Sequence, residues 1–109
     1  MPAYLAVEIS IHDPTSYARY KQLAPPSIAR YGGRYLTRGG AMETLEGERR
    51  PERFVILEFP DVETARAWWA SPEYAEAKAL RQASATTEML LLEGLSAAAQ
   101  AELASRASG

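Results

Sequence analysis

The segment from Tyr31 to Phe59 constrains the fold most, because it reads as two strands joined by a long polar loop. It begins with YGGRYLTRGG and ends with PERFVILEFP, so an arginine-rich strand is followed by an apolar strand that carries one carboxylate, Glu58. Glycine adopts the positive φ angles that tight turns require, and glycine pairs bracket the first strand. The segment therefore predicts a hairpin with strands over residues 34–38 and 53–59.

The chain before this hairpin predicts one strand and one helix. Residues 4–11 alternate between apolar and other side chains, with the period of two that a strand has. Asp13 followed by Pro14 is typical of a helix start, and apolar residues then recur every three or four positions as far as Tyr31. Two consecutive prolines, Pro25 and Pro26, predict a break or a kink in this helix.

The chain after the hairpin predicts a second helix in two pieces and a final strand. The first piece begins at Asp61, and the second begins at Ser71 and runs to about residue 83, because a capping residue precedes each piece. Residues 86–93 are assigned to a strand from their place in the pattern. The alanine-rich tail, residues 96–109, is separate from the domain formed by residues 1–95 and is predicted to fray at its ends.

The order strand, helix, strand, strand, helix, strand predicts a ferredoxin-like βαββαβ fold of the α+β class. Its four-stranded antiparallel sheet has both helices on one face, which leaves roughly 400 Å² of semi-apolar sheet uncovered. A monomer seldom exposes such a surface, so we expect a homodimer. RNA-recognition motifs share this strand order, but RFVILEF lacks the glycines of their signature.

Composition argues against several classes of partner and cofactor. The chain has 109 residues, no cysteine and one histidine, His12, so we expect no metal and no other cofactor. The net charge is −2, and glutamates are interleaved with the arginines of residues 30–53, which argues against nucleic-acid binding. No apolar run approaches the ~20 residues of a membrane span. The N-terminus reads as a strand and not as a signal peptide, so we expect a cytoplasmic protein without a membrane partner.

Two charged residues of the predicted sheet are candidates for chemistry. Arg38 could anchor an anionic ligand, because a guanidinium binds carboxylates in a bidentate manner, and Glu58 could act as an acid or base. The alternative is that the two form an ion pair at a dimer interface.

Aromatic residues on the two predicted helices are candidates for the walls of a cavity, and core packing is the alternative for each of them. They are Tyr17, Tyr20, Trp68, Trp69 and Tyr74. Asp13 is either the cap of the first helix or a ligand-binding residue at the mouth of a pocket.

The sequence also resembles a known family. The segments that carry the resemblance are DPTSYARY, YGGRYLTRGG, PERFVILEFP and ARAWWASPEYAEAKALR, with the pairs Glu46–Gly47 and Glu93–Gly94. In this order they look like the dimeric α+β barrel superfamily and, within it, the domain-of-unknown-function 1330 family, over about residues 3–95. The resemblance implies a homodimer of two facing sheets with a cavity in each protomer, and it implies no agreed reaction.

Two functions follow from these predictions. The first is a small-molecule-binding homodimer that works as a cofactor-free oxygenase or isomerase on a small conjugated or aromatic acid. Arg38 would then be the anchor, Glu58 the base, and Trp68, Tyr20 and Tyr74 the walls. The second is a non-catalytic ligand-binding or stress-associated dimer. Fold alone does not choose between them.

Overall fold

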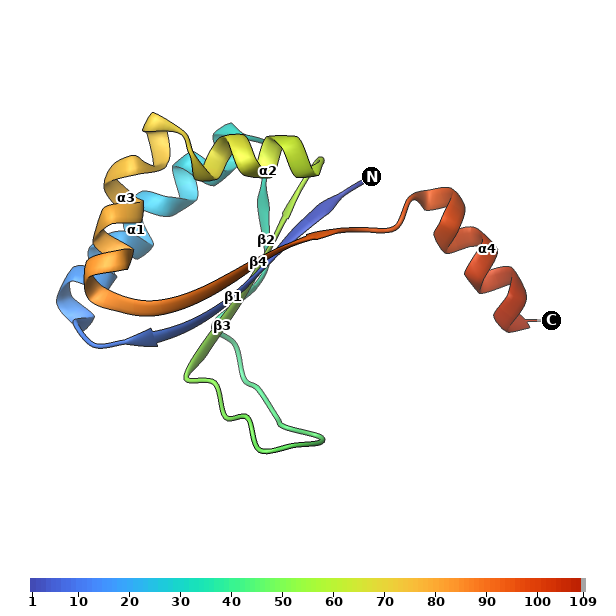
Figure 1. The fold of residues 1–109 in the computed structure, drawn as a ribbon, viewed down its shortest axis with the longest axis horizontal. Helices are drawn as coiled ribbons and strands as arrows, with labels where there is room; N and C mark the ends of the chain where they lie inside the picture. Colours follow the sequence, from blue (N-terminus) through green and yellow to red (C-terminus); the bar gives the residue numbers. More distant parts are fainter. Residues whose placement is uncertain (109) are drawn as a thin grey trace.

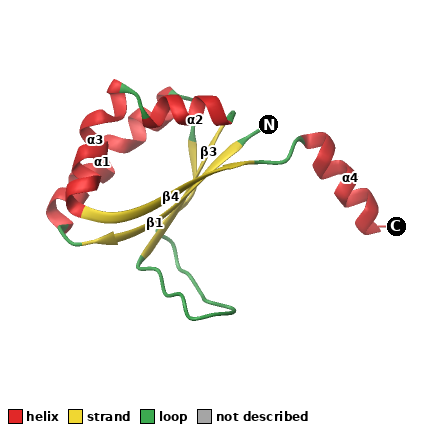
Figure 2. Ribbon diagram, in the orientation of Figure 1, coloured by secondary structure: helices red, strands yellow, loops and turns green. Residues whose placement is uncertain are grey.

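The computed structural model describes residues 1–108, with side chains described as far as Arg106. It confirms the ferredoxin-like fold: a four-stranded antiparallel sheet in the order β2-β3-β1-β4, packed against helices (Figures 1 and 2). The elements are β1 Ala3–Ile11, α1 Pro14–Arg30, β2 Arg34–Arg38, β3 Arg53–Phe59, α2 Val62–Trp69, α3 Pro72–Ser84, β4 Ala85–Glu93 and α4 Ala97–Ser108.

The core lies between the sheet and the helices α1, α2 and α3, which all lie on one side of the sheet (Figure 1). Alternation along β1 sends Leu5, Val7 and Ile9 to this side, where each is less than 5 % exposed. Leu5 lies opposite Leu57 of β3, and Val7 lies opposite Val55. The strand pattern of the sequence therefore fixes which face of the sheet is covered.

Helix α1 is continuous through its two prolines, so of the predicted break or kink the structure excludes the break. A proline inside a helix removes one N–H and leaves the carbonyl four residues earlier without its partner. For Pro25 that carbonyl belongs to Lys21, and the Nη2 atom of Arg38 donates to it over 2.6 Å. The hydroxyl of Ser27, directly after the prolines, donates to the Ala24 carbonyl over 2.7 Å. Side-chain donors thus satisfy carbonyls near the prolines.

A bulge in β2 decides where its side chains point. Tyr35 lies opposite Leu57, but the next pair joins Thr37 to Ile56, so Leu36 is the extra residue. An extra residue inverts the alternation that follows it. As a result both Tyr35 and Arg38 face the helices, although an unbroken strand would place them on opposite faces.

The other face of the sheet carries no helix (Figure 1). Cross-strand partners share a face, and one row on this side runs from Thr37 to an apolar stretch of Ile56, Ala6 and Leu90. Leu90 is 65 % exposed. We call the face that carries this row the open face.

Helix α4 follows β4 and lies apart from the sheet and from the other helices (Figure 1). Leu103 on this helix is 48 % exposed. Among the described residues, no helix is long and apolar enough to span a membrane.

Candidate ligand cavity

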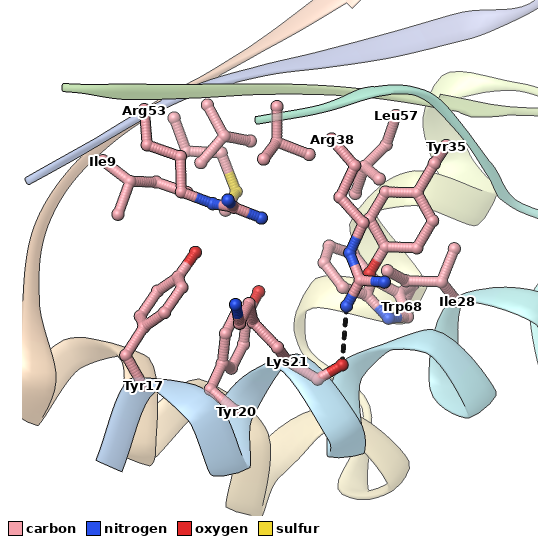
Figure 3. Close-up of a pocket in the computed structure, with 13 residues that line it drawn as sticks. Ile9, Tyr17, Tyr20, Lys21, Ile28, Tyr35, Arg38, Arg53, Leu57 and Trp68 are labelled. Carbon is pink, nitrogen blue, oxygen red and sulfur yellow. Dashed lines mark hydrogen bonds between the residues drawn. The ribbon is translucent and has the colours of Figure 1, made fainter. Parts of the chain in front are cut away.

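A small cavity lies between α1 and the sheet (Figure 3). Its volume is about 20 Å³, which is room for roughly one water molecule. Tyr17 and Tyr20 rise from α1 toward the sheet, and Arg38 and Arg53 reach in from the strands. The lining residues are Val7, Ile9, Tyr17, Tyr20, Lys21, Ile28, Tyr35, Arg38, Arg53, Val55, Leu57, Trp68 and Met89.

Three cationic side chains mark the place where the cavity meets the surface. Lys21, Arg38 and Arg53 line both the cavity and an adjoining open groove, together with Ala18 and Gln22 in the groove. Neither set of described lining residues includes an aspartate or a glutamate. No ion pair to these three cations forms among the described side chains. The entrance is therefore a positively charged surface without a resident counter-charge.

Arg38 closes the entrance across the gap between β2 and α1. Its Nη2 atom donates to the Lys21 carbonyl, as Figure 3 shows, and its guanidinium lies 4.8 Å from the centre of the Tyr35 ring. The side chain is exposed to solvent beyond these contacts. One hydrogen bond and one cation–π contact at a surface position are weak enough for a ligand to displace.

Arg53 begins β3 and reaches over the ring of Tyr17, with 5.7 Å between the guanidinium carbon and the ring centre. Its Nε atom is buried and has no hydrogen-bond partner among the described residues. Gly39, whose φ is +69°, lies against the same guanidinium, and a β-carbon at this position would overlap it. Glycine suits this position because of its positive φ angle, and a larger residue would also displace the Arg53 guanidinium.

The inner wall of the cavity is aromatic. Trp68 is fully buried, its ring centre lies 4.0 Å from that of Tyr74, and its Nε1 atom donates to the Ser27 hydroxyl over 3.0 Å. The hydroxyls of Tyr20 and Tyr74 are 3.0 Å apart. Burial raises the pKa of the Tyr20 hydroxyl well above its usual value. Tyr20 is therefore a neutral hydrogen-bonding group in this wall and not a base.

Three of the predicted ligand-binding residues, Tyr20, Arg38 and Trp68, line this cavity. Tyr74 lies behind the wall and is fully buried. Asp13 is not among the described lining residues: its carboxylate caps α1, accepting from the Ser16 backbone N–H at 3.3 Å and from the Ser16 hydroxyl at 2.9 Å.

Glu58 lies on the open face, across the sheet from the cavity. It accepts from Arg34 Nε at 2.7 Å, and this hydrogen bond holds the pKa of its carboxyl below the usual value. Within one protomer, Arg38 and Glu58 therefore neither pair nor share a pocket, contrary to the joint action predicted for them. The physical reason is the bulge at Leu36, which turns Arg38 to the helix side.

Sequence reasoning missed Arg53 and Tyr35 as cavity residues. Arg53 could have been found, because it shares the alternation of Val55 and Leu57 and therefore their face. Tyr35 had no such signal, since its strand is short. Among the described residues, no three histidine, cysteine or acidic side chains lie close enough together to hold a metal ion.

With this geometry in place, comparison with known proteins identifies the family. A model for a domain of unknown function, DUF1330, matches residues 2–95. The chain belongs to the DUF1330 family. The matched segment contains every lining residue of the cavity, whereas helix α4 of this DUF1330 protein follows the match. No curated protein matches this DUF1330 chain.

Several solved structures share the fold of this DUF1330 protein. A protein of unknown function from Rhodopseudomonas palustris has a TM-score of 0.73 and 22% identity, over 87% of this chain and 83% of that chain. A dimeric ferredoxin-like protein of unknown function from Jannaschia sp. has a TM-score of 0.64 and 15% identity, over 86% of this chain and 100% of that chain. SnoaB, a cofactor-independent oxygenase from Streptomyces nogalater, has a TM-score of 0.60 and 17% identity, over 87% of this chain and 94% of that chain.

Proposed function

We propose that this DUF1330 protein is a cytoplasmic homodimer that binds a small aromatic or conjugated acid in the cavity between α1 and the sheet. The observation that carries the proposal is the set of three cations, Lys21, Arg38 and Arg53, at the entrance of an aromatic cavity whose described lining contains no carboxylate. Unpaired cations attract an anion, and guanidinium groups bind carboxylates in a bidentate manner. The aromatic and aliphatic walls suit the ring or conjugated chain of the acid.

The ligand enters by displacing Arg38. The cavity of about 20 Å³ is too small for an aromatic acid in this arrangement, so the entrance has to open. Arg38 is the movable part, because it is exposed and its hydrogen bond goes to a single carbonyl, that of Lys21. The carboxylate of the ligand then replaces this carbonyl as the acceptor for the guanidinium.

The homodimer in this proposal forms through the open face. Apolar side chains cross this face on three strands, and Leu90 and Leu92 at its edge are 65 % and 48 % exposed. Contiguous apolar surfaces of this kind mark protein interfaces. The ferredoxin-like protein from Jannaschia sp. that shares the fold is described as dimeric, which supports the same assembly here.

A benzoate derivative tests the binding proposal. We expect 4-isopropylbenzoate to bind, and its uncharged amide to bind at least tenfold more weakly, when both are measured by isothermal titration calorimetry. The variants Arg38→Met and Arg53→Met should each weaken the acid about 30-fold, since a hydrogen bond between charged groups contributes about 2 kcal/mol. Arg19→Met is the matched control, because Arg19 is an exposed arginine of α1 that pairs with Glu76.

Equal affinity for the acid and the amide would contradict the proposal, and so would an Arg19→Met effect as large as that of Arg38→Met. Thermal unfolding of each variant separates loss of binding from loss of fold. Arg38→Met should lower the melting temperature slightly, because the Lys21 carbonyl loses its partner. Arg53→Met should lower it less, because the buried Nε atom of Arg53 has no hydrogen bond to lose.

The enzymatic form of this proposal is a cofactor-independent oxygenase in which the bound conjugated anion supplies all the electrons that reduce dioxygen: the C=C bond of the substrate is cleaved, and each of its two carbons takes one oxygen atom as a new carbonyl. The cations at the entrance favour it, since fixed positive charge stabilises an anionic substrate. SnoaB shares the fold and is named as such an oxygenase. An isomerase that relies on Glu58 is not proposed, because Glu58 lies on the open face. Oxygen uptake with 4-hydroxycinnamate, measured with and without a chelator, tests the oxygenase. If uptake does not exceed the rate without protein, the oxygenase form is overturned and only the binding proposal stands.

A further inference from the structure

A chain of three polar side chains runs from the core to the cavity. Arg81 is 5 % exposed, and its Nε atom donates to the Tyr74 hydroxyl oxygen over 3.2 Å. The Tyr74 oxygen lies 3.0 Å from the Tyr20 hydroxyl oxygen. Tyr20 is the member of this chain that lines the cavity, as Figure 3 shows. The three groups come from two helices, α1 and α3.

Chemistry fixes the direction of the first of these hydrogen bonds, and burial favours one direction for the second. Arg81 can only donate, so the Tyr74 oxygen accepts from it. The Tyr74 hydroxyl is fully buried, and its own hydrogen needs an acceptor. Either hydroxyl could donate in the Tyr20–Tyr74 contact, and donation by Tyr74 is the arrangement that gives the fully buried Tyr74 hydrogen an acceptor among the described residues. The hydrogen of Tyr20 then has no protein acceptor among the described residues and is left for the cavity.

The positive charge of Arg81, at the buried end of this chain of hydrogen bonds, strengthens the Tyr20 hydroxyl as a donor. Hydrogen bonds in a chain polarise one another, and the effect is larger where the local dielectric constant is low. No ion pair to Arg81 forms among the described residues, so its positive charge is not cancelled before it acts on Tyr74. Tyr20 is thus a polarised donor held in place by two partners behind it.

We propose that the acid bound in this cavity carries a second, uncharged acceptor oxygen, such as a ketone carbonyl, which accepts a hydrogen bond from the Tyr20 hydroxyl. This inference rests on the proposed function and narrows its ligand to a keto-substituted aromatic or conjugated acid. The carboxylate lies at the entrance, where Lys21 and Arg38 also line the groove, and the ketone lies deeper, because Tyr20 lines the cavity without lining the groove.

The rest of the cavity fits this assignment. Arg38, Arg53 and Lys21 offer donors only, and the Trp68 N–H is already bound to Ser27. A ligand that brings acceptor oxygens therefore satisfies the site better than one that brings donors. The raised pKa of Tyr20 keeps its proton in place through the neutral and moderately alkaline range, so the donor does not become an acceptor there.

Two matched acids test the assignment on the full chain. 4-Acetylbenzoate carries the ketone oxygen, 4-isopropylbenzoate has nearly the same shape without it, and 3-acetylbenzoate covers the other ring position. Tyr20→Phe should weaken the better acetyl isomer about tenfold, since one hydrogen-bond donor is lost, and should change the affinity for 4-isopropylbenzoate less than twofold. Tyr31→Phe is the control, because the Tyr31 hydroxyl donates to Glu73 outside the cavity.

An infrared measurement separates the hydrogen bond from a change of shape. The carbonyl stretch of ¹³C-labelled acetylbenzoate should fall in frequency on binding to the wild-type protein. It should return to the value for an unbonded ketone in Tyr20→Phe and lie between the two in Tyr74→Phe, where Tyr20 loses its own donor. A Tyr31→Phe protein should give the wild-type frequency.

The outcomes distinguish this inference from the proposed function. If 4-isopropylbenzoate binds and Tyr20→Phe weakens both acids equally, or the carbonyl frequency is the same in wild type and variant, the ketone assignment is overturned while anion binding stands. If 4-isopropylbenzoate binds and neither acetyl isomer does, the assignment also fails. If no acid binds, both proposals are overturned. Unchanged affinity of Tyr20→Phe for 4-isopropylbenzoate shows that the variant cavity is folded.

Discussion

Replacement of Trp68 by alanine is expected to lower the free energy of unfolding by about 4 kcal/mol, because it empties the largest fully buried site of the core. The indole packs between Phe59 and Tyr74, with ring centres 5.3 Å and 4.0 Å away. Its N–H also satisfies the Ser27 hydroxyl over 3.0 Å. Denaturation by guanidinium chloride, followed by circular dichroism, measures the change.

The neighbouring tryptophan supplies a matched control. Trp69 is 44 % exposed, and Lys78 lies 3.9 Å from the centre of its ring. Trp69→Ala should therefore cost only about 1 kcal/mol, the size of a partly exposed cation–π contact and some lost packing. Similar losses for the two variants would contradict the assignment of Trp68 as the wall between core and cavity.

The sequence predicted the elements well because their signals are local. Alternation marked β1, and the residues Asp13, Asp61 and Ser71 marked the starts of α1, α2 and α3, where each side chain accepts from a backbone N–H three residues later. Such signals depend on a few adjacent residues. The order of the elements then limits the fold to very few arrangements.

The direction of single side chains in β2 could not be predicted in the same way. The bulge at Leu36 depends on how this short strand pairs with β3, and nothing in RYLTR marks it. One extra residue reversed the face of Arg38, separated it from Glu58 and placed it at the cavity. An error of one position in register therefore changed the functional interpretation while the fold remained correct.

Partners that are distant in sequence were also beyond prediction. The sequence places Pro25 inside α1, but it does not show that Arg38 supplies the donor for the freed Lys21 carbonyl. Tyr74 and Tyr20 are 54 residues apart, and their contact depends on how α1 packs against α3. Arg81 reads as an ordinary surface residue of a charged helix until that packing buries it.

The second large effect concerns the proposed dimer. Leu90→Asp should dissociate it, because the new carboxylate falls at the β4 end of the apolar row formed by Ile56, Ala6 and Leu90, on the face where the second copy packs. An unpaired charge buried in an interface costs several kcal/mol, which weakens association by at least 100-fold. Glu88, two residues away on the same face, adds repulsion. In the single protomer Leu90 is 65 % exposed, so the variant should still fold.

Sedimentation velocity at micromolar concentration measures this result. The wild-type protein should sediment near 24 kDa, twice the 12.0 kDa of one chain, and the Leu90→Asp variant near 12 kDa. Leu103→Asp is the matched control, since Leu103 is a half-exposed leucine of α4, away from the sheet. It should leave the dimer intact. If Leu103→Asp dissociates the dimer and Leu90→Asp does not, the interface lies on α4 and not on the open face. The reason is that a new charge weakens association only where it is buried between two copies.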